Sequence, residues 1–138
     1  MPCIIVQVDT IAEVASSSID GNIYNYLFGF LSDCDYAKLY LNVTDPAWAS
    51  HLAEIVYVFG NPAASEKPFS EKDKILNKEI MSRWANFARS GIPFASTSEE
   101  EWLPVVPVSD NNSLDIYANV GVDPRYWYIT GDGGGTMI

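Results

Sequence analysis

One segment of this 138-residue chain, residues 70–90, carries the signals of an amphipathic helix at both ends. Ser70 followed three residues later by Asp73 is a capping signature, in which the hydroxyl and the carboxylate satisfy free backbone N–H groups of the first turn. Gly91 can end the helix in the left-handed conformation, and Pro93 prevents its continuation. The sequence therefore predicts a helix from Ser70 to Ser90.

Apolar residues recur along this segment at intervals of three and four residues, which predicts the face that the helix buries. They are Leu76, Ile80, Trp84, Phe87 and Ala88. We expect Trp84 and Phe87 to lie in the core rather than in a ligand site. Glu79 and Arg83 are expected to pair across one turn of the solvent-exposed face.

The segments before this helix give weaker signals. The apolar spacing of Ile4 to Ala15 predicts a helix, which Ser16 to Ser18 and Asp20 to Asn22 would end. Ile23 to Phe30 is aromatic and β-branched at its start and predicts a sheet strand that is buried on both faces. Asp33 to Ser50 is irregular and contains a proline, so we expect a loop there.

Composition limits the number of domains and the classes of partner. With 48% hydrophobic residues in 15.3 kDa, the chain has enough apolar material for one core but not two, so residues 1–138 are interpreted as one unit. A net charge of −10, from 8 basic and 18 acidic residues, argues against nucleic-acid binding, because no basic stripe is available to contact phosphates. We expect no membrane span, because the apolar runs are far shorter than the ~20 residues that a bilayer requires.

The chain has a single histidine, His51, at the start of an unusual run. The run reads Trp48-Ala49-Ser50-His51-Leu52-Ala53-Glu54-Ile55-Val56-Tyr57-Val58-Phe59-Gly60. It resembles the segment around the catalytic histidine of type-B carboxylesterases, the cholinesterase and fungal lipase branch of the α/β-hydrolases. An imidazole titrates near neutral pH, so it can take a proton from a serine hydroxyl and return it to a leaving alcohol. The resemblance implies this catalytic role for His51.

Other segments extend the resemblance over roughly residues 20 to 117. Residues 80–93 contain Trp84-Ala85-Asn86-Phe87-Ala88 and close in Gly91-Ile92-Pro93, which is similar to the family's long helix. Trp102-Leu103-Pro104 matches its tryptophan-proline element loosely, and Leu114-Asp115-Ile116 its short terminal strand. The resemblance implies an α/β fold: the C-terminal portion of an α/β-hydrolase, with a sheet strand, a histidine loop, a long amphipathic helix and a short terminal strand. Residues 118–138 match no pattern that we interpret, and Tyr126-Trp127-Tyr128 there is expected to be a packing cluster.

The family's chemistry needs partners that this sequence does not supply. A nucleophilic serine sits on a Gly-x-Ser-x-Gly elbow ahead of the acid and the histidine, and no such pentapeptide occurs here. Glu54 lies three residues from His51 and is interpreted as a hydrogen-bond acceptor that fixes the histidine loop; Asp9 and Glu13 are also too close in sequence to be the expected acid. The resemblance implies an ester or lipid substrate, a secreted intact parent, and no metal or cofactor. We expect the chain to be inactive alone.

Two readings remain open beside the esterase. Family members that have lost catalysis serve as binding or adhesion modules, and the chain could also be a truncated product. Leu52 stands where the family usually has a small residue such as glycine, and its bulk would crowd the backbone beside the imidazole. Cys3 and Cys34 could form one disulfide in an oxidising compartment or could be two small buried thiols.

Overall fold

The computed structural model of the chain describes residues 11–44, 49–60, 67–96, 101–105, 126–129 and 135–136. Contacts within the chain divide it into two compact units. The first comprises Met1–Tyr26, Trp102–Trp127 and Met137–Ile138, and the second comprises Leu27–Glu101 and Tyr128–Thr136.

In the first unit, residues 11–18 form a helix that continues through the three serines expected to end it. The hydroxyls of Ser16 and Ser17 donate to the carbonyl of Glu13, at 2.8 and 3.1 Å, and that of Ser18 donates to the carbonyl of Val14, at 2.7 Å. Serine hydroxyls that bond back to the preceding turn are compatible with helical backbone, which explains why the predicted end was wrong. The expected residues 4–10 of this helix lie outside the described part.

Trp102 organises the described remainder of the first unit. Its side chain is buried, and its indole N–H donates to the carbonyl oxygen of Asn25 at 2.8 Å. The rings of Tyr24 and Tyr26 meet the indole edge-on, with centroids 5.9 and 6.1 Å away. The tryptophan-proline element is therefore a packing element that fixes the start of the first strand.

The sheet that the described residues form has three strands, in the order β1-β2-β3. Strand β1 (Asn25–Phe28) is shorter than the segment predicted, and only Asn25 is fully buried in it, so burial on both faces was wrong. Strands β2 (Tyr126–Ile129) and β3 (Gly135–Thr136) pair antiparallel, with Tyr128 opposite Thr136. Both lie within residues 118–138, where no strand was predicted; Tyr126 to Tyr128, which were expected to be a packing cluster, belong to β2. The expected strand at residues 114–116 lies outside the described part.

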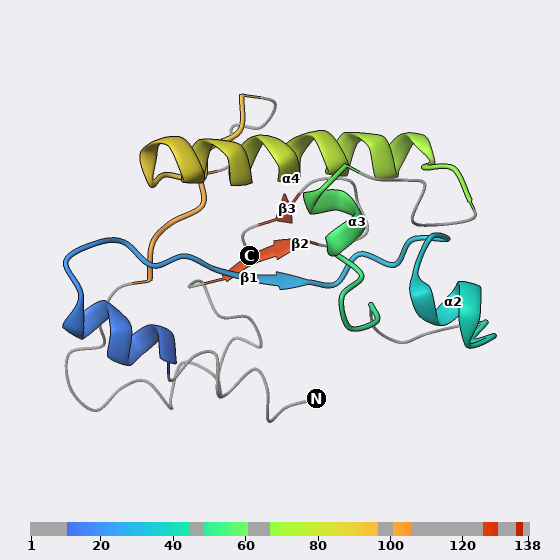
Figure 1. Cartoon of the computed structure of the whole chain (residues 1–138), viewed down its shortest axis with the longest axis horizontal. Coiled ribbons are helices and arrows are strands. Elements are labelled where there is room, and N and C mark those ends of the chain that lie inside the picture. The colour runs from blue at the N-terminus through green and yellow to red at the C-terminus, as the bar shows by residue number, and fades with distance from the viewer. Residues whose placement is uncertain are drawn as a thin grey trace. The chain divides into compact units, whose positions relative to one another are not determined.

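Helix α4 (Glu71–Ser90) dominates the second unit, and both of its predicted ends are confirmed (Figure 1). Ser70 is the N-cap: its hydroxyl accepts the N–H of Asp73, whose carboxylate accepts the N–H of Ser70 in return. Gly91 is the C-cap at φ 74°, in the left-handed region, and its N–H donates to the carbonyl of Phe87. Capping is local chemistry, which is why the sequence placed these ends correctly.

The buried face of α4 differs from the predicted apolar stripe. Leu76 and Ile80 are fully buried as expected, but Phe87 is 47% exposed and Trp84 is only partly buried. Polar side chains share the buried face instead, at helical spacing. Its members are Asp73, Leu76, Glu79, Ile80, Arg83 and Asn86.

These buried polar groups are paired, which makes their burial tolerable. The Arg83 guanidinium donates to the Glu79 carboxylate at 2.9 Å, with both side chains inside the unit rather than on the solvent-exposed face as predicted. Arg83 also donates to the carbonyl of Pro93 at 3.0 Å, and the Asn86 amide donates to that of Phe94 at 2.9 Å. The helix thus holds the segment that follows it.

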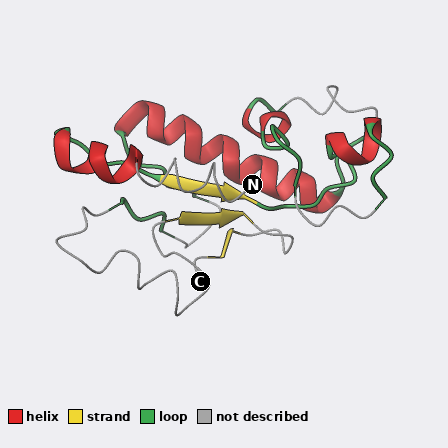
Figure 2. Cartoon of the chain, turned by 90° about the horizontal axis from the view of Figure 1, so that it is seen from below, coloured by secondary structure: helices red, strands yellow, loops and turns green. Residues whose placement is uncertain are grey.

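Among the described residues of the second unit, two short helices precede α4. Helix α2 (Tyr36–Tyr40) lies within the segment that the sequence analysis expected to be a loop. Helix α3 (Ile55–Val58) begins after the turn that carries His51 and packs on α4, as Figure 1 shows and Figure 2 confirms from a second direction. The Asn77 amide of α4 donates to the carbonyl of Tyr57 at 2.7 Å and fixes α3 along the longer helix.

An aromatic cluster forms the core between α3 and the N-terminal end of α4. Tyr57 is 1% exposed, and its ring stacks on that of Phe69 with centroids 5.1 Å apart. Phe28 and Phe30 contact the same tyrosine, with centroids 5.5 and 5.9 Å from its ring. Of the aromatic residues that follow the histidine, Tyr57 is therefore used for packing, whereas Phe59 is 73% exposed.

Candidate functional site

His51 lies in a turn that leads into α3, and its side chain is exposed. The turn is closed by two backbone hydrogen bonds: the N–H of Ala53 donates to the carbonyl of Ser50 at 3.1 Å, and that of Ile55 donates to the carbonyl of Leu52 at 3.2 Å. An imidazole that shuttles protons must be accessible to the reacting groups, and this position meets that requirement. The expected loop thus ends in an ordered turn.

Leu52, directly after the histidine, has a φ of 68°. This left-handed conformation suits glycine and strains residues that carry a Cβ. Its side chain is 56% exposed, so the free energy gained from packing offsets little of the strain. The structure thus gives a physical reason for the small residue that the family's pattern usually has here.

Replacing Leu52 with glycine is expected to raise the free energy of unfolding by up to about 1 kcal/mol. Relief of left-handed strain contributes roughly 1–2 kcal/mol, and the added freedom of a glycine in the unfolded chain offsets about 0.5–1 kcal/mol of it. Urea unfolding followed by circular dichroism measures the change. Leu41→Gly is the matched control, because Leu41 is 61% exposed and does not have a positive φ. The control should be less stable than the parent chain, and a loss of stability in Leu52→Gly would contradict the strain.

Glu54 fixes the histidine turn through its backbone rather than its side chain. Its carbonyl accepts the N–H groups of Tyr57 at 2.9 Å and Val58 at 3.0 Å, which starts α3. The side chain makes no capping hydrogen bond at this position. The expectation of a carboxylate that holds the loop was therefore wrong for Glu54.

The buried carboxylate of Asp73, further along the chain, accepts hydrogen bonds from several residues. Its two oxygens accept the hydroxyls of Ser32 at 2.7 Å, Tyr57 at 2.6 Å and Ser70 at 2.5 Å, together with the N–H of Ser70 at 2.7 Å. Burial alone would raise the pKa of Asp73, but the hydrogen bonds from Ser32, Ser70 and Tyr57 outweigh it and hold the pKa below its ordinary 3.8. Asp73 is therefore an ionised structural group. It joins α4 to α3 and to the segment that follows β1.

The same network acts on Tyr57. Burial raises the pKa of its phenol strongly, and donation to the Asp73 carboxylate raises it further. Tyr57 therefore stays protonated and remains a hydrogen-bond donor. Sequence reasoning identified Ser70 and Asp73 as a helix cap but missed Ser32 and Tyr57, since their contacts with Asp73 span 41 and 16 residues.

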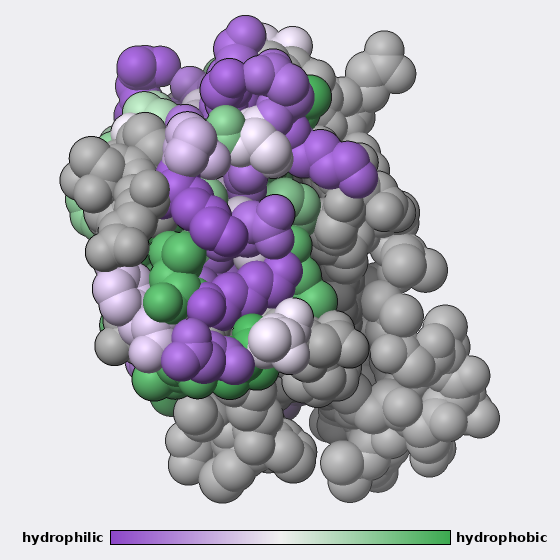
Figure 3. Space-filling view, turned by 90° about the vertical axis from the view of Figure 1, so that its right-hand side faces the viewer, coloured by the Kyte–Doolittle hydropathy of each residue, from purple (hydrophilic) through white to green (hydrophobic). Residues whose placement is uncertain are grey.

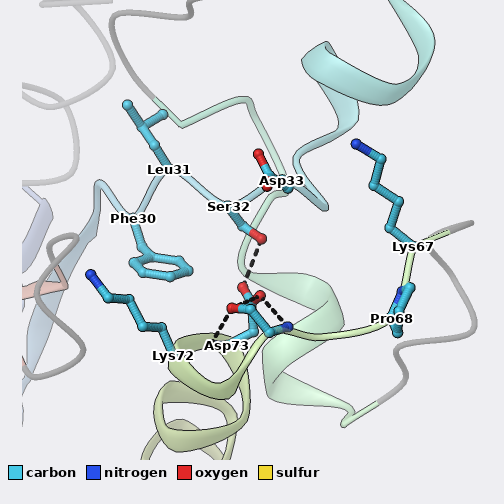
Figure 4. Close-up of a pocket in the computed structure, with 9 residues that line it drawn as sticks. Phe30, Leu31, Ser32, Asp33, Lys67, Pro68, Lys72 and Asp73 are labelled. Atoms are coloured by element: carbon cyan, nitrogen blue, oxygen red, sulfur yellow. Dashed lines mark hydrogen bonds between the residues drawn. The ribbon is translucent and has the colours of Figure 1, made fainter.

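A pocket of about 360 Å³ lies beside this network (Figure 4). It is lined by Phe30, Leu31, Ser32, Asp33, Lys67, Pro68, Ser70, Lys72 and Asp73. Hydrophilic side chains dominate the described surface on the side that carries α2 and the N-terminal end of α4 (Figure 3). His51 does not line the pocket, so the pocket and the candidate catalytic group are separate features.

The cysteines and the remaining acidic candidates do not form a site with His51 in the described part of the chain. Cys34 is buried and carries a free thiol, whereas Cys3 and Asp9 lie outside the described residues. Glu13 lies in the helix of the first unit. Within the described ranges, no group of three or more His, Cys, Asp or Glu side chains is arranged to hold a metal ion. None of the described helices has the length and apolar character that crossing a membrane requires.

Comparison with known proteins identifies the family. The profile of the carboxylesterase family matches residues 3–126, which is most of the chain. The chain therefore belongs to the carboxylesterase family, and membership implies an α/β-hydrolase fold. The resemblance inferred from the histidine segment and the long helix is confirmed.

Individual relatives match this chain over a part of their own length. Bile salt-activated lipase of Bos taurus is 33% identical over 110 residues, which cover 77% of this chain and 17% of the lipase. Acetylcholinesterase of Gallus gallus is 32% identical over 89 residues, covering 63% of this chain and 11% of that protein. Neuroligin-3 of Macaca mulatta is 28% identical over 116 residues, covering 72% of this chain and 54% of that protein. The chain thus spans about a sixth of the length of the bovine lipase.

Proposed function

We propose that this chain contributes the catalytic histidine of a serine carboxylic ester hydrolase. His51 would take the proton of a serine hydroxyl as general base while that serine attacks the ester carbonyl, and would then return it to the leaving alcohol. The observation that carries the proposal is the exposed imidazole on an ordered turn, within the segment that resembles the family's histidine segment. Membership in the carboxylesterase family supports an ester as the substrate class.

In this proposal residues 1–138 belong to one carboxylesterase domain and form its C-terminal part. The sequence contains no Gly-x-Ser-x-Gly elbow, and the described carboxylates nearest in sequence to His51 have other roles: Glu54 starts α3, and Asp35 binds a backbone amide. The serine, the triad acid and the oxyanion-stabilising amides would come from a segment that precedes these residues in the parent protein. The chain covers 17% of the bovine lipase and 11% of the chicken acetylcholinesterase, which supports a role as one part of a larger domain.

A chimera tests the proposal. The segment of bovine bile salt-activated lipase that matches this chain is replaced by this chain, and hydrolysis of p-nitrophenyl butyrate is measured. We expect turnover by the chimera, loss to the uncatalysed rate in His51→Gln, and none from the isolated 138-residue chain. Lys78→Gln, an exposed change on α4, is the matched control and should keep the rate. A chimera that unfolds cooperatively yet lacks turnover, or one that is indifferent to His51→Gln, would contradict the proposal.

A second candidate function is a non-catalytic binding module of the same family. Leu52 favours it, because a bulky side chain where the family's pattern has a small one would displace the imidazole, and displacement by about 1 Å costs on the order of 10²-fold in rate. Neuroligin-3 is among the matched relatives, over 72% of this chain. The gene region that precedes the codon of Met1 discriminates the two: an encoded Gly-x-Ser-x-Gly elbow supports the esterase, and a substituted serine supports the binding module.

A further inference from the structure

Asp35 makes a long-range contact with the backbone of the turn that carries His51. It is 3% exposed, and its carboxylate oxygen Oδ2 accepts the backbone N–H of Ser50 at 2.9 Å, across 15 residues of chain. Its own carbonyl accepts the N–H of Leu39 at 3.0 Å and so begins α2. Asp35 therefore joins the start of α2 to Ser50, the residue before His51, so that the two ends of the segment between them are held together.

The segment that carries Asp35 is itself fixed to α4. The N–H of Asp35 donates to the carbonyl of Ser32 at 3.3 Å, and the Ser32 hydroxyl accepts the N–H of Cys34 at 2.9 Å. The same hydroxyl donates to Asp73, in the first turn of α4. A continuous set of hydrogen bonds thus runs from the N-terminal end of α4 to Asp35 and on to Ser50.

The other side of the histidine turn is anchored to the same helix. Tyr57, six residues after His51, donates its hydroxyl to Asp73, and its carbonyl accepts the amide of Asn77. His51 therefore lies between two attachments, one through Asp35 and one through Tyr57, and both lead to α4. Without the first attachment the backbone ahead of His51 has one restraint fewer.

We propose that Asp35 is a positioning residue for His51, acting through the backbone amide of Ser50 to fix the direction in which the imidazole leaves the turn. The role rests on the proposed function of His51. Asp35 is not a triad acid in this proposal, because its carboxylate accepts a backbone N–H rather than an imidazole N–H. Displacement of a catalytic group by about 1 Å can cost on the order of 10²-fold in rate, so one such anchor is sufficient to affect turnover.

The first experiment measures the anchor in the full 138-residue chain, without activity. Amide hydrogen exchange of Ser50 is followed by NMR in Asp35→Ala, Asp35→Asn and the control Asp33→Ala, in which an 83% exposed carboxylate is removed. We expect exchange at Ser50 to become about 10- to 100-fold faster in Asp35→Ala. The Asn variant retains an acceptor oxygen and should lie closer to the parent, and the control should equal the parent. Protected amides of Leu76 and Ile80 verify that α4 remains folded.

The imidazole supplies a second, independent signal. His51 is the only histidine, so its ring protons give one assignable set of resonances. In Asp35→Ala these should move toward the positions of an unfolded peptide, whereas Asp33→Ala should leave them in place. Unchanged Ser50 exchange together with unchanged His51 resonances in Asp35→Ala would overturn the proposal.

Activity in the lipase chimera separates this inference from the proposed function. Asp35→Ala is expected to lower kcat by about 10- to 100-fold with KM changed by less than about twofold, because a misdirected base affects the reacting state more than substrate binding. A chimera in which Asp35→Ala leaves kcat unchanged while His51→Gln abolishes it would overturn the positioning role and leave the catalytic histidine intact. A folded chimera that is inactive in every version, combined with the NMR changes, would overturn the catalytic role and retain the anchor.

Discussion

Replacing Arg83 with methionine is expected to lower the free energy of unfolding by about 3–5 kcal/mol, because it leaves the buried Glu79 carboxylate without its cation. The Arg83 side chain is 0% exposed and that of Glu79 is 5% exposed, so water cannot replace the lost partner. The carbonyl of Pro93 loses its donor at the same time. Since a domain is stable by roughly 5–15 kcal/mol in total, this single change should bring the chain close to unfolding.

A double-variant cycle gives the interaction within the pair. Glu79→Met in the Arg83→Met background removes the stranded carboxylate, so the double variant is expected to recover about half or more of the lost stability. What remains lost should reflect the unpaired Pro93 carbonyl, at about 1–3 kcal/mol. Equilibrium unfolding in urea at neutral pH measures all four corners.

The same helix offers an exposed pair as the control. Lys74 and Glu71 are 2.6 Å apart, but their side chains are 58% and 86% exposed. Lys74→Met should therefore change stability by less than about 1 kcal/mol. A loss in Arg83→Met no larger than that of Lys74→Met would show that the Arg83–Glu79 pair contributes nothing beyond an ordinary surface ion pair.

This pair also illustrates what could be predicted from the sequence and what could not. The ends of α4 were predictable because Ser70, Asp73 and Gly91 act within a few residues of the helix that they terminate. Of its buried face only Leu76 and Ile80 were predicted, because the prediction counted apolar residues only. Arg83 is buried through contacts with Glu79 and Pro93, and nothing in its local pattern indicates that both partners would be enclosed.

The candidate site divides in the same way. The position of His51 was identified from a resemblance in sequence, and the structure places its side chain in contact with solvent. The anchors of its turn were missed because Asp35 reaches Ser50 across 15 residues and Ser32 reaches Asp73 across 41. Asp35 lies in a segment expected to be a loop, where an aspartate is usual and gives no sign of burial.

Strands β2 and β3 were missed for another reason. The run at residues 126–129 is aromatic and ends in isoleucine, which is a strand signal, but its neighbours are rich in glycine. Strand β2 occupies the middle of the order β1-β2-β3, and its partner β1 is distant in sequence, so a local pattern cannot identify that pairing. Its other partner, β3, is close in sequence, with Ile129 opposite Gly135, but it is short and begins with a glycine, so it carries no strand signal.

Replacing Asp73 with asparagine is expected to lower the free energy of unfolding by about 2–4 kcal/mol at neutral pH, since it weakens several charge-assisted hydrogen bonds and the helix cap together. One side of an asparagine can still accept, but its NH₂ group would face the N–H of Ser70, which is also a donor. The buried hydroxyls of Ser32 and Tyr57 would then compete for a single neutral oxygen.

The loss should depend on pH in a definite direction. The folded pKa of Asp73 lies below its ordinary 3.8, so the folded state binds the proton more weakly than the unfolded state. The stabilisation is therefore complete above about pH 5 and is lost as the pH falls through 3.8 toward the folded pKa, at up to about 1.4 kcal/mol per pH unit. Below both pKa values the parent carries a neutral carboxylic acid similar in shape to the asparagine of the variant. The difference in stability between Asp73→Asn and the parent should therefore shrink as the pH falls below about 5.

Comparison with a second aspartate isolates this effect from the other acidic groups of the chain. Asp33 lies one residue from Ser32, is exposed, and pairs with Lys38 at 3.4 Å. Asp33→Asn should change stability by less than about 1 kcal/mol at every pH, because an exposed ion pair is worth little. Thermal unfolding of the parent and both variants from pH 7 to pH 3 provides the measurement. A stability difference for Asp73→Asn that stays constant over this range would mean that the hydrogen-bonded carboxylate is not the ionised group that links α3, α4 and the segment after β1.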